Sequence, residues 1–557
     1  MAVSFWLKTI TPIHIGSGKE IAPEEYFYHN GKSFRIDLEQ CFKFLGEKVG
    51  FKTLKDRLQD WSEYIIQNTQ MTSETKAREK YQLSIFDFVT NFLKDSSLKK
   101  VLESEIINNE RFHLYFLESP EKPRTNVIEI AKLPDNSAYI PGSSIKGVIR
   151  TALLFISILE QPNFNFNRFI PQGSEKIKPK ELDDRLYEEF FYCRFEDQRH
   201  FDAKYDLLKF IGVRDCYIVE SNASNPFELM KVDLFLRNGK TQPQTPTVEL
   251  IKENVVFKGE IFVDLKAMKQ IAKMLRPDDS IIDERGKKVW IGFGRKFQRL
   301  FQIDIQSLLD DGKEEEIEGR IIERIFIALS LFAKAVHNSD LSWLEDFSKS
   351  KKPDTSVLIN GLKSFYQNRL NPIPNKFKIG WASGFTATTV FLALLNKPDI
   401  QNDLKEIYKK YIHRRGKNIP MEQFPISRRM AMDNNLQPLP LGWVEFSLSE
   451  LIKTQETHPT EPSEEVETNP EETKPQFPIE MKIFKGTTNI PAKVVSNTSK
   501  PFKVELLVKG YEDKIYNCSG VDNLASIPPG TLIYTMVTDF DTKKNEIRML
   551  KFIKQIS

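Results

Sequence analysis

The stretch Tyr139–Leu154, YIPGSSIKGVIRTALL, decides how the rest of this 557-residue chain is interpreted. Pro141 and Gly142 end the segment before them, and Ser143 or Ser144 is a natural N-cap for a helix. Apolar residues then recur at the spacing of a helix buried along one face, namely at Ile145, Val148, Ile149, Ala152, Leu153 and Ile156. The stretch therefore predicts a tight turn followed by a core helix.

Two cations, Lys146 and Arg150, stand four residues apart at the edge of this apolar stripe. Like charges at that spacing repel by roughly 0.2–0.5 kcal/mol, and both lie near the positive end of the helix dipole. An anion between the cations and the free backbone N–H groups would make the arrangement favourable, and phosphate is the obvious one. The alternative is a solvated basic edge on an ordinary core helix.

Composition indicates a soluble globular protein of two to four domains, with 28% charged and 40% hydrophobic residues. No run approaches the roughly 18 apolar residues of a membrane span, and the N-terminus is typical of a strand. The four cysteines lack metal-binding or disulfide spacing. We therefore expect a cytoplasmic protein with reduced thiols, without membrane association, metal or other cofactor.

An acidic, Pro-rich linker is predicted at residues 453–478, which hold two lysines, seven glutamates and five prolines. Its net charge is −5, so subtracting it from the total of +3 leaves +8, a basic excess compatible with nucleic acid. Residues 479–557 then predict a small OB-like β-barrel. Its strands are expected at Met481–Phe484, Ala492–Val495, Val504–Val508, Thr531–Thr538 and Glu546–Ile553.

Before the linker, the periodicity predicts an α+β fold. Strands are expected at Val3–Ile10, Tyr26–Tyr28, Ser33–Ile36, Arg111–Leu117, Asn126–Ala131, Phe210–Glu220, Asn254–Leu265 and Pro438–Phe446. Asn30-Gly31 is a strong hairpin signal, and Asp37 with Gln40 resembles a capping box. A charged helical insertion follows at about 41–110, and further helices are expected at Ile317–Val336 and Thr386–Leu395. Arg214 and Asp215 are interpreted as an ion pair at a strand end.

Three glycine loops carry basic neighbours, and their backbone N–H groups can hold anions. The first comprises Gly16, Ser17, Gly18 and Lys19 after His14, the second Gly292, Gly294, Arg295 and Lys296, and the third Lys378, Gly380, Ser383 and Gly384. Arg414 and Arg415 belong to the densest basic cluster. With Ser143, Ser144, Lys146 and Arg150, these residues form the candidate phosphate-binding set.

The segments TPIHIGSGKE (11–20), YFYHNGKSFRID (26–37) and YIPGSSIKGVIRTALL together resemble RAMP-superfamily proteins of CRISPR type III effectors. The likeness is greatest to the family of the fifth subunit of type III-A (Csm) complexes. IGVRDC (211–216), the loop Gly380–Gly384 and PLGWVEF (440–446) carry the same resemblance, which covers roughly residues 1–450. The linker and the barrel match nothing in that family.

The resemblance implies ferredoxin-like (RRM-type) folds at 1–265, with the helical insertion, and a second RAMP-like or helical region at 266–452. It also implies a subunit that caps the filament of backbone subunits, binds the 3′ part of the CRISPR RNA (crRNA) and is linked to its maturation. The implied partners are the crRNA, backbone RAMP subunits, small helical subunits and, as candidates, host nucleases. The candidate phosphate-binding residues would then hold RNA backbone without reading bases.

The runner-up function is a metal-independent endoribonuclease with His14 as general acid or base. No second histidine or tyrosine can be paired with His14 from the sequence. Backbone RAMP subunits cleave with an aspartate, yet no aspartate follows Gly18 before Asp37, which is interpreted as a helix cap. We therefore expect no catalytic residue. A third possibility is a protein-bridging scaffold formed by the insertion and the barrel. Asp539 and Asp541 are interpreted as a solvated turn rather than a metal site.

Overall fold

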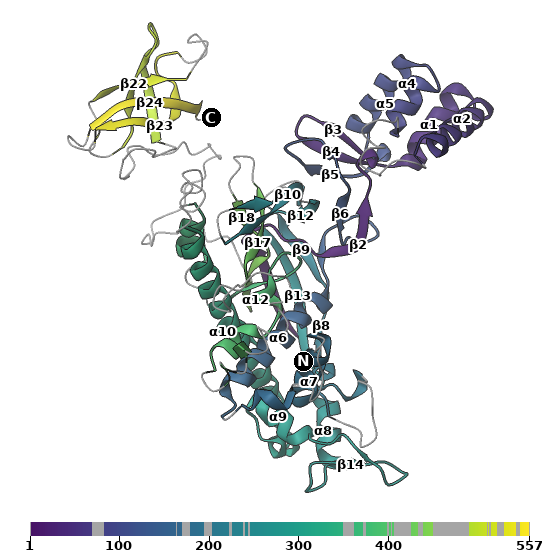
Figure 1. The fold of residues 1–557 in the computed structure, drawn as a ribbon, viewed down its shortest axis with the longest axis vertical. Coiled ribbons are helices and arrows are strands. Elements are labelled where there is room, and N and C mark those ends of the chain that lie inside the picture. The colour runs from purple at the N-terminus through teal and green to yellow at the C-terminus, as the bar shows by residue number, and fades with distance from the viewer. Residues whose placement is uncertain are drawn as a thin grey trace, which may run out of the picture. The chain divides into compact units, whose positions relative to one another are not determined.

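The structure is a computed structural model, and the chain divides into two compact units, Met1–Lys453 and Thr454–Ser557 (Figure 1). Each unit has its own hydrophobic core. The structure describes all residues except 1, 70–82, 163, 170–178, 194–202, 222–224, 238–239, 243–245, 349–360, 371–374, 398–399, 401, 403, 406–424, 433–437, 449–489, 509–510, 512–513, 521–527, 542–545 and 556–557.

A seven-stranded sheet is built around the N-terminal strand β1 (Ala2–Thr9). This strand pairs antiparallel with β13 (Val255–Val263) on one side and with β19 (Trp443–Ser447) on the other. The remaining strands are β7 (Tyr139–Ile140), β8 (Ile211–Val213), β9 (Cys216–Ser221) and β16 (Lys376–Lys378). Alternate residues of β1 face the core, with Phe5 and Leu7 buried, as the period of a strand requires.

A ten-stranded sheet has β10 (Phe227–Leu236) at its centre, paired with strands β5, β11, β12 and β17. Its other strands are β2 (Gly16–Ile21), β3 (Tyr26–His29), β4 (Lys32–Ile36), β5 (His113–Glu118), β6 (Val127–Ile130), β11 (Thr241–Gln242), β12 (Thr247–Ile251), β17 (Ser427–Met432) and β18 (Pro438–Pro440). The predicted β3–β4 hairpin is confirmed, and Asn30 and Gly31 adopt the positive φ angles, 45° and 77°, that its turn requires.

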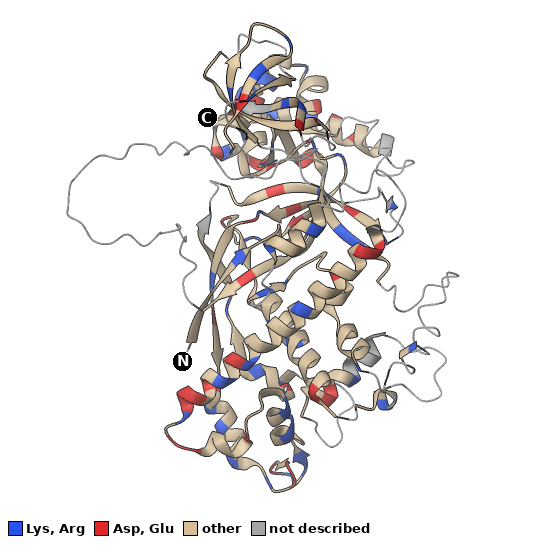
Figure 2. Cartoon of the chain, turned by 90° about the vertical axis from the view of Figure 1, so that its left-hand side faces the viewer, with Lys and Arg blue, Asp and Glu red and all other residues tan. Residues whose placement is uncertain are grey.

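The predicted core helix is α6 (Gly142–Glu160), which packs against the long helix α10 (Glu314–Ser348). Within the described residues α6 is apolar and long enough to cross a membrane, but most of it is buried in the core. The longer helices lie to one side of the strands near the N-terminus (Figure 2). Further helices are α7 (Pro179–Phe190), α8 (Leu265–Met274), α9 (Phe293–Phe301), α12 (Phe385–Thr388) and α13 (Phe391–Leu395).

Among its described residues this unit also contains short 3-10 turns, a π-helical turn and a small hairpin. They are η1 (Pro23–Glu25), η2 (Glu110–Phe112), η3 (Phe166–Phe169), η4 (Ala203–Tyr205), η5 (Leu207–Phe210), η6 (Ile305–Leu309), the π-turn η7 (Phe365–Arg369), β14 (Ile281–Ile282) and β15 (Lys288–Val289).

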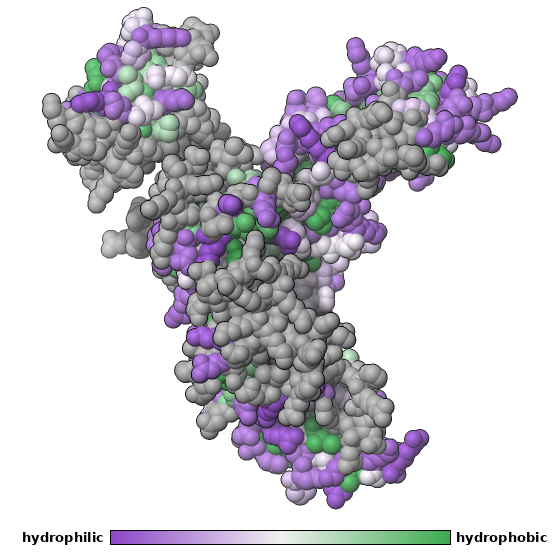
Figure 3. Space-filling model, in the orientation of Figure 1, coloured by the Kyte–Doolittle hydropathy of each residue, from purple (hydrophilic) through white to green (hydrophobic). Residues whose placement is uncertain are grey.

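The region predicted as a helical insertion contains α1 (Leu38–Val49), α2 (Phe51–Thr69), α4 (Ile85–Asn91) and α5 (Ser96–Asn108). These helices share a separate core, and hydrophilic residues dominate their visible surface (Figure 3). Asp37 caps α1 by accepting from the Gln40 N–H at 3.1 Å. The Gln40 side chain instead accepts from Arg111, so the predicted capping box is only half formed.

The C-terminal unit is a closed five-stranded barrel in the order β20-β21-β22-β24-β23. Its strands are β20 (Ile490–Ser496), β21 (Phe502–Leu506), β22 (Ile515–Ser519), β23 (Leu532–Asp541) and β24 (Glu546–Gln555). A small barrel is therefore confirmed, but β22 was not predicted. The predicted strand Met481–Phe484 lies outside the described residues. Asp539 and Asp541 end β23 rather than occupy a turn.

The α+β class is confirmed, whereas three further local predictions are wrong. Phe210–Glu220 is not one strand, because the chain breaks at Arg214-Asp215 between β8 and β9. The helix expected at Thr386–Leu395 is two short helices, α12 and α13. Arg214 pairs with Glu260 at 2.6 Å rather than with Asp215. Strands from both predicted regions, 1–265 and 266–452, share the two sheets. The division of this unit into two regions at residue 265 remains a prediction.

Candidate functional site

The start of α6 is closed by a carboxylate of the chain itself. The Gly142 N–H donates to Asp215 Oδ1 at 2.7 Å, and the N-cap is Pro141 rather than Ser143 or Ser144. A Cβ on Gly142 would lie 2.2 Å from the Val213 carbonyl oxygen, so only glycine permits this approach. Asp215 thus occupies the helix end where the sequence suggested phosphate.

The two cations of α6 have different environments. Arg150 forms an ion pair with the buried Asp206, and its guanidinium lies 5.5 Å from the centre of the Tyr187 ring. Burial lowers the pKa of Lys146, and the charge of Asp206 only partly opposes that shift. Lys146 is half-buried, and no described carboxylate lies within ion-pair distance of it. The predicted anion near Arg150 is therefore Asp206, and Lys146 remains available.

In the second glycine loop, too, a carboxylate of the chain itself occupies the predicted phosphate position. Asp279 accepts from the backbone N–H groups of Gly294 at 2.7 Å and Arg295 at 3.2 Å, at the start of α9. Gly292 has the left-handed φ of +85° that begins this turn. Lys296 is buried and donates to two backbone carbonyls, and burial lowers its pKa to about 8. Of this set only the Arg295 side chain faces solvent.

The first and third glycine loops meet. We call their meeting point the glycine junction, formed by Pro12–Lys19, Ile379–Phe385 and Gly442. The Trp381 N–H donates to the His14 carbonyl at 2.8 Å, and the Gly442 N–H donates to the Pro12 carbonyl at 3.0 Å. A Cβ on Gly380 would lie 2.3 Å from the His14 carbonyl oxygen, so this glycine is required for close approach.

His14 lies beneath the glycine junction and is 1% exposed. Its Nδ1–H donates to the Glu249 carbonyl at 2.7 Å, which leaves Nε2 as the unprotonated nitrogen. Burial lowers the pKa of His14, and the hydrogen bond to Glu249 only partly opposes this. The imidazole is thus neutral near pH 7 and links the segment between β1 and β2 to strand β12.

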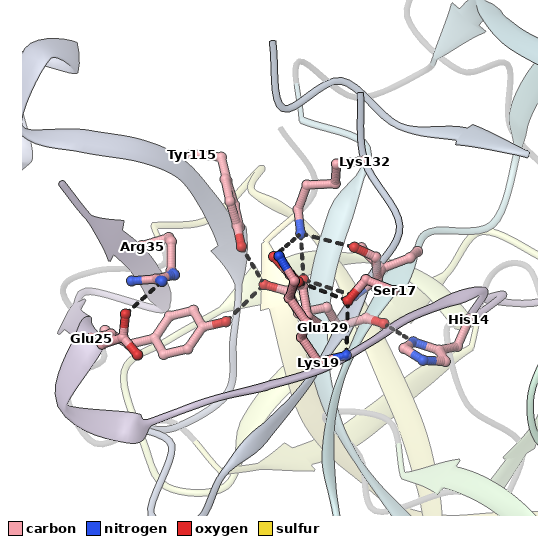
Figure 4. Close-up of polar contacts among 11 residues, drawn as sticks. His14, Ser17, Lys19, Glu25, Arg35, Tyr115, Glu129 and Lys132 are labelled. Carbon is pink, nitrogen blue, oxygen red and sulfur yellow. Dashed lines mark hydrogen bonds and ion pairs between the residues drawn. The ribbon is translucent and has the colours of Figure 1, made fainter. Parts of the chain in front are cut away.

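The Glu249 carboxylate, next to His14, is the centre of a buried hydrogen-bond network (Figure 4). It accepts from the hydroxyls of Tyr26 and Tyr115, both at 2.8 Å, and from Lys132 Nζ at 2.6 Å. The fourth donor is the Ile130 N–H at 3.1 Å. Because its oxygens are satisfied by four donors, Glu249 fixes β12 and β6 behind the glycine junction.

Lys378, another candidate, is buried and forms an ion pair with Asp340, whose Oδ2 lies 2.7 Å from Lys378 Nζ. Arg428 Nε lies 3.0 Å from the other carboxylate oxygen of Asp340. Although burial alone would raise the pKa of Asp340, the two cations hold it below its usual value. The burial of Lys378 and Lys296 does not fit the phosphate contacts expected for them. Ser383 is also buried, and its hydroxyl donates to the Gly380 carbonyl at 2.6 Å.

The exposed parts of the glycine junction are Gly16–Lys19 in β2 and Phe385, beside partly exposed Trp381 and Gly384. Ser17 donates to Glu129 at 2.7 Å and accepts from the Lys19 N–H at 3.1 Å, which holds the loop in place (Figure 4). Arg429, on β17, is exposed and lies 5.0 Å from the centre of the Trp381 ring.

Several candidates thus stay apart. Ser143, Ser144, Lys146 and Arg150 belong to α6, and the second glycine loop belongs to α9. Arg414 and Arg415 lie outside the described residues. In the parts of the chain that the structure describes, no group of three or more His, Cys, Asp or Glu side chains could hold a metal ion.

Comparisons with known proteins place the chain in a family. The RAMP superfamily model matches residues 6–414, so the chain belongs to the RAMP superfamily. Within it the chain is Csm5-like. It is 25% identical over 395 residues to the CRISPR system protein Csm5 of Methanocaldococcus jannaschii, covering 63% of this chain and 83% of that protein. It is 28% identical over 242 residues to Csm5 of Streptococcus thermophilus, covering 40% of this chain and 58% of that protein.

Two solved structures are similar at 20% sequence identity. A chain in a cryo-EM structure of a type III-A Csm–crRNA–target RNA ternary complex covers 80% of this chain and is itself covered completely, with a TM-score of 0.49. The crystal structure of T. onnurineus Csm5 covers 79% of this chain and is 99% covered, with a TM-score of 0.48.

Proposed function

We propose that this chain is a non-catalytic RNA-binding subunit of a type III-A CRISPR (Csm) effector complex. It binds the 3′ part of the crRNA, caps the filament of backbone RAMP subunits and assists crRNA maturation. Membership of the RAMP superfamily and similarity to Csm5 support this role. The observation that carries it is the glycine junction, where backbone N–H groups and exposed Lys19 and Arg429 lie beside close-packed glycines.

The remaining parts of the proposal follow from the same role. Ferredoxin-like folds in residues 1–452 are supported by antiparallel β1, β13 and β19 with helices on one side. The barrel is OB-like, with closed five-stranded topology as its support. The crRNA, the backbone subunits and the small helical subunits are the partners in the cytoplasm, and host nucleases act on the RNA that this subunit presents.

RNA binding is tested with the full chain and a labelled crRNA over a series of salt concentrations. Alanine at Lys19, Lys146 and Arg429 together should weaken binding and reduce the salt slope by about 2, because each lost phosphate contact on single-stranded RNA removes about 0.7. Lys99→Ala is the control, since Lys99 lies on α5, outside the glycine junction and α6, with its side chain 38% exposed. An unchanged salt slope in the triple variant would contradict the proposal.

The non-catalytic assignment rests on the position of His14, whose buried ring already donates to Glu249. A general acid or base must reach the proton that it transfers. We therefore expect a precursor crRNA to remain intact with the purified chain in EDTA, as judged on a denaturing gel. Site-specific cutting that is lost in His14→Asn would favour the endoribonuclease instead.

A further inference from the structure

Three aromatic rings and one lysine form a row across the open face of the seven-stranded sheet. Strand register places Tyr139 opposite Tyr217, Tyr217 opposite Lys258, and Lys258 opposite Trp6. Directly opposed residues of antiparallel strands project to the same face. We call Tyr139, Tyr217, Lys258 and Trp6 the aromatic row. Adjacent strands lie about 4.8 Å apart, so the row spans about 15 Å.

The aromatic row lies on the face of the sheet that points away from its core. On β1 the core residues are Phe5 and Leu7, which alternate with Trp6. Tyr217 is 50% exposed, and none of the three rings belongs to a hydrophobic cluster of the described residues. Lys258 holds its ammonium 5.2 Å from the centre of the Trp6 ring. The row is thus accessible and is not required to fill the core.

We propose that the aromatic row binds a single-stranded RNA segment, with two or three bases stacked on its rings and a phosphate held by Lys258. This inference deepens the proposed function, on which it rests, because it adds contacts to bases to the backbone contacts of the glycine junction. RRM-type sheets stack two or three bases on exposed aromatic side chains in this way. Stacking accepts any base, so the row tolerates any sequence.

Charge favours RNA over a protein partner at this face. Lys258 has no carboxylate partner among the described residues, whereas the neighbouring Glu260 is neutralised by Arg214 at 2.6 Å. A second carboxylate on this face, Glu445, stands opposite Lys8 and lies 3.9 Å from Lys376. Glu260 and Glu445 thus each have a cation beside them, and Lys258 remains to attract a polyanion.

Position also connects the aromatic row to the phosphate contacts already proposed. Tyr139 is the last ring of the row and precedes Pro141 and Gly142, where α6 begins. Lys146 lies one turn further along that helix. The aromatic row therefore ends seven positions before Lys146 in the sequence, next to the start of the helix that carries this cation.

The test uses the full chain, a fluorescent ten-nucleotide oligouridine and two pairs of variants. Tyr217→Leu and Trp6→Leu remove a ring, while Tyr217→Phe and Trp6→Phe keep one. We expect each leucine variant to raise Kd roughly tenfold with an unchanged salt slope, because a ring releases no counter-ions. The phenylalanine variants should bind like the parent. Phe51→Leu, at an exposed aromatic on α2, is the control.

Circular dichroism first establishes that each variant is folded, and 5-iodouridine crosslinking of the unchanged protein gives a readout independent of any variant. A crosslink in a peptide containing Tyr217 or Trp6 supports the proposal. Equal affinities of the leucine and phenylalanine variants, with no such crosslink, overturn it. If Lys146→Ala still weakens binding in that case, the proposed function stands without the aromatic row. Loss of copurifying effector subunits with unchanged RNA affinity identifies a protein interface and also overturns it.

Discussion

At the scale of single residues, aspartates of the chain itself occupy several of the sites where the sequence predicted a bound anion. Asp206, Asp215 and Asp279 fill positions near Arg150, at the start of α6 and at the start of α9. Carboxylates at these places stabilise helix ends and cations as phosphate would. The sequence alone cannot tell whether a cation near a glycine binds phosphate or a carboxylate of the chain. The exposed Lys19 and the half-buried Lys146, which has no ion-pair partner among the described residues, are the better candidates for RNA.

Two glycines of α6 provide a direct test of this local geometry. Gly142→Ala should destabilise the chain by about 2 kcal/mol or more, because its Cβ would lie 2.2 Å from the Val213 carbonyl oxygen. Gly147→Ala is the matched control in the same helix, where nothing lies within 4 Å. It should stabilise by about 0.5–1 kcal/mol, since alanine is the better helix former. Chemical unfolding measures both, and equal effects of the two substitutions would contradict the close approach.

At the scale of elements, sequence patterns were sufficient where one periodicity dominated. The core helix, the β3–β4 hairpin and the helices of 41–110 follow from apolar spacing and from Asn30-Gly31. The central strand β10 was missed because Lys231 and Asp233 interrupt its alternation. Its partner β12 is fully buried and includes Glu249, a residue that sequence rules assign to the surface.

The glycines of the candidate site could be predicted from the sequence, but the residues that contact them in the fold could not. Spacing predicts turns at Gly16, Gly18 and Gly380, but Gly16 and Gly18 lie in an irregular part of strand β2 rather than in a turn. No local signal brings His14 to Trp381. Asp206 lies 56 positions from Arg150, and Asp215 lies 73 from Gly142. Such pairings depend on the tertiary fold, so propensity and periodicity carry no information about them.

At the scale of the whole molecule, the two units should behave independently in stability. Residues 1–453 without the barrel should keep the unfolding midpoint of the full chain within about a degree, because each unit has a separate core. Differential scanning calorimetry of the truncated and full chains compares these midpoints. A shift of about 4 °C or more in the transition of 1–453, corresponding to roughly 1–2 kcal/mol, would show that the units are coupled.

The central place of β1 in its sheet sets a condition on synthesis. Strand β1 is synthesised first, and one of its two neighbours in the sheet, β19, is synthesised near the end of the unit. The Trp443 N–H donates to Thr11 Oγ1 across 432 positions of the chain. At ribosomal rates of about 5–20 residues per second, roughly 20 to 90 seconds separate these segments. Until Gly442 emerges, the loops at Gly16 and Gly380 lack a contact that joins them. The complete glycine junction, and with it the RNA contact proposed there, can therefore form only after nearly the whole first unit has left the ribosome.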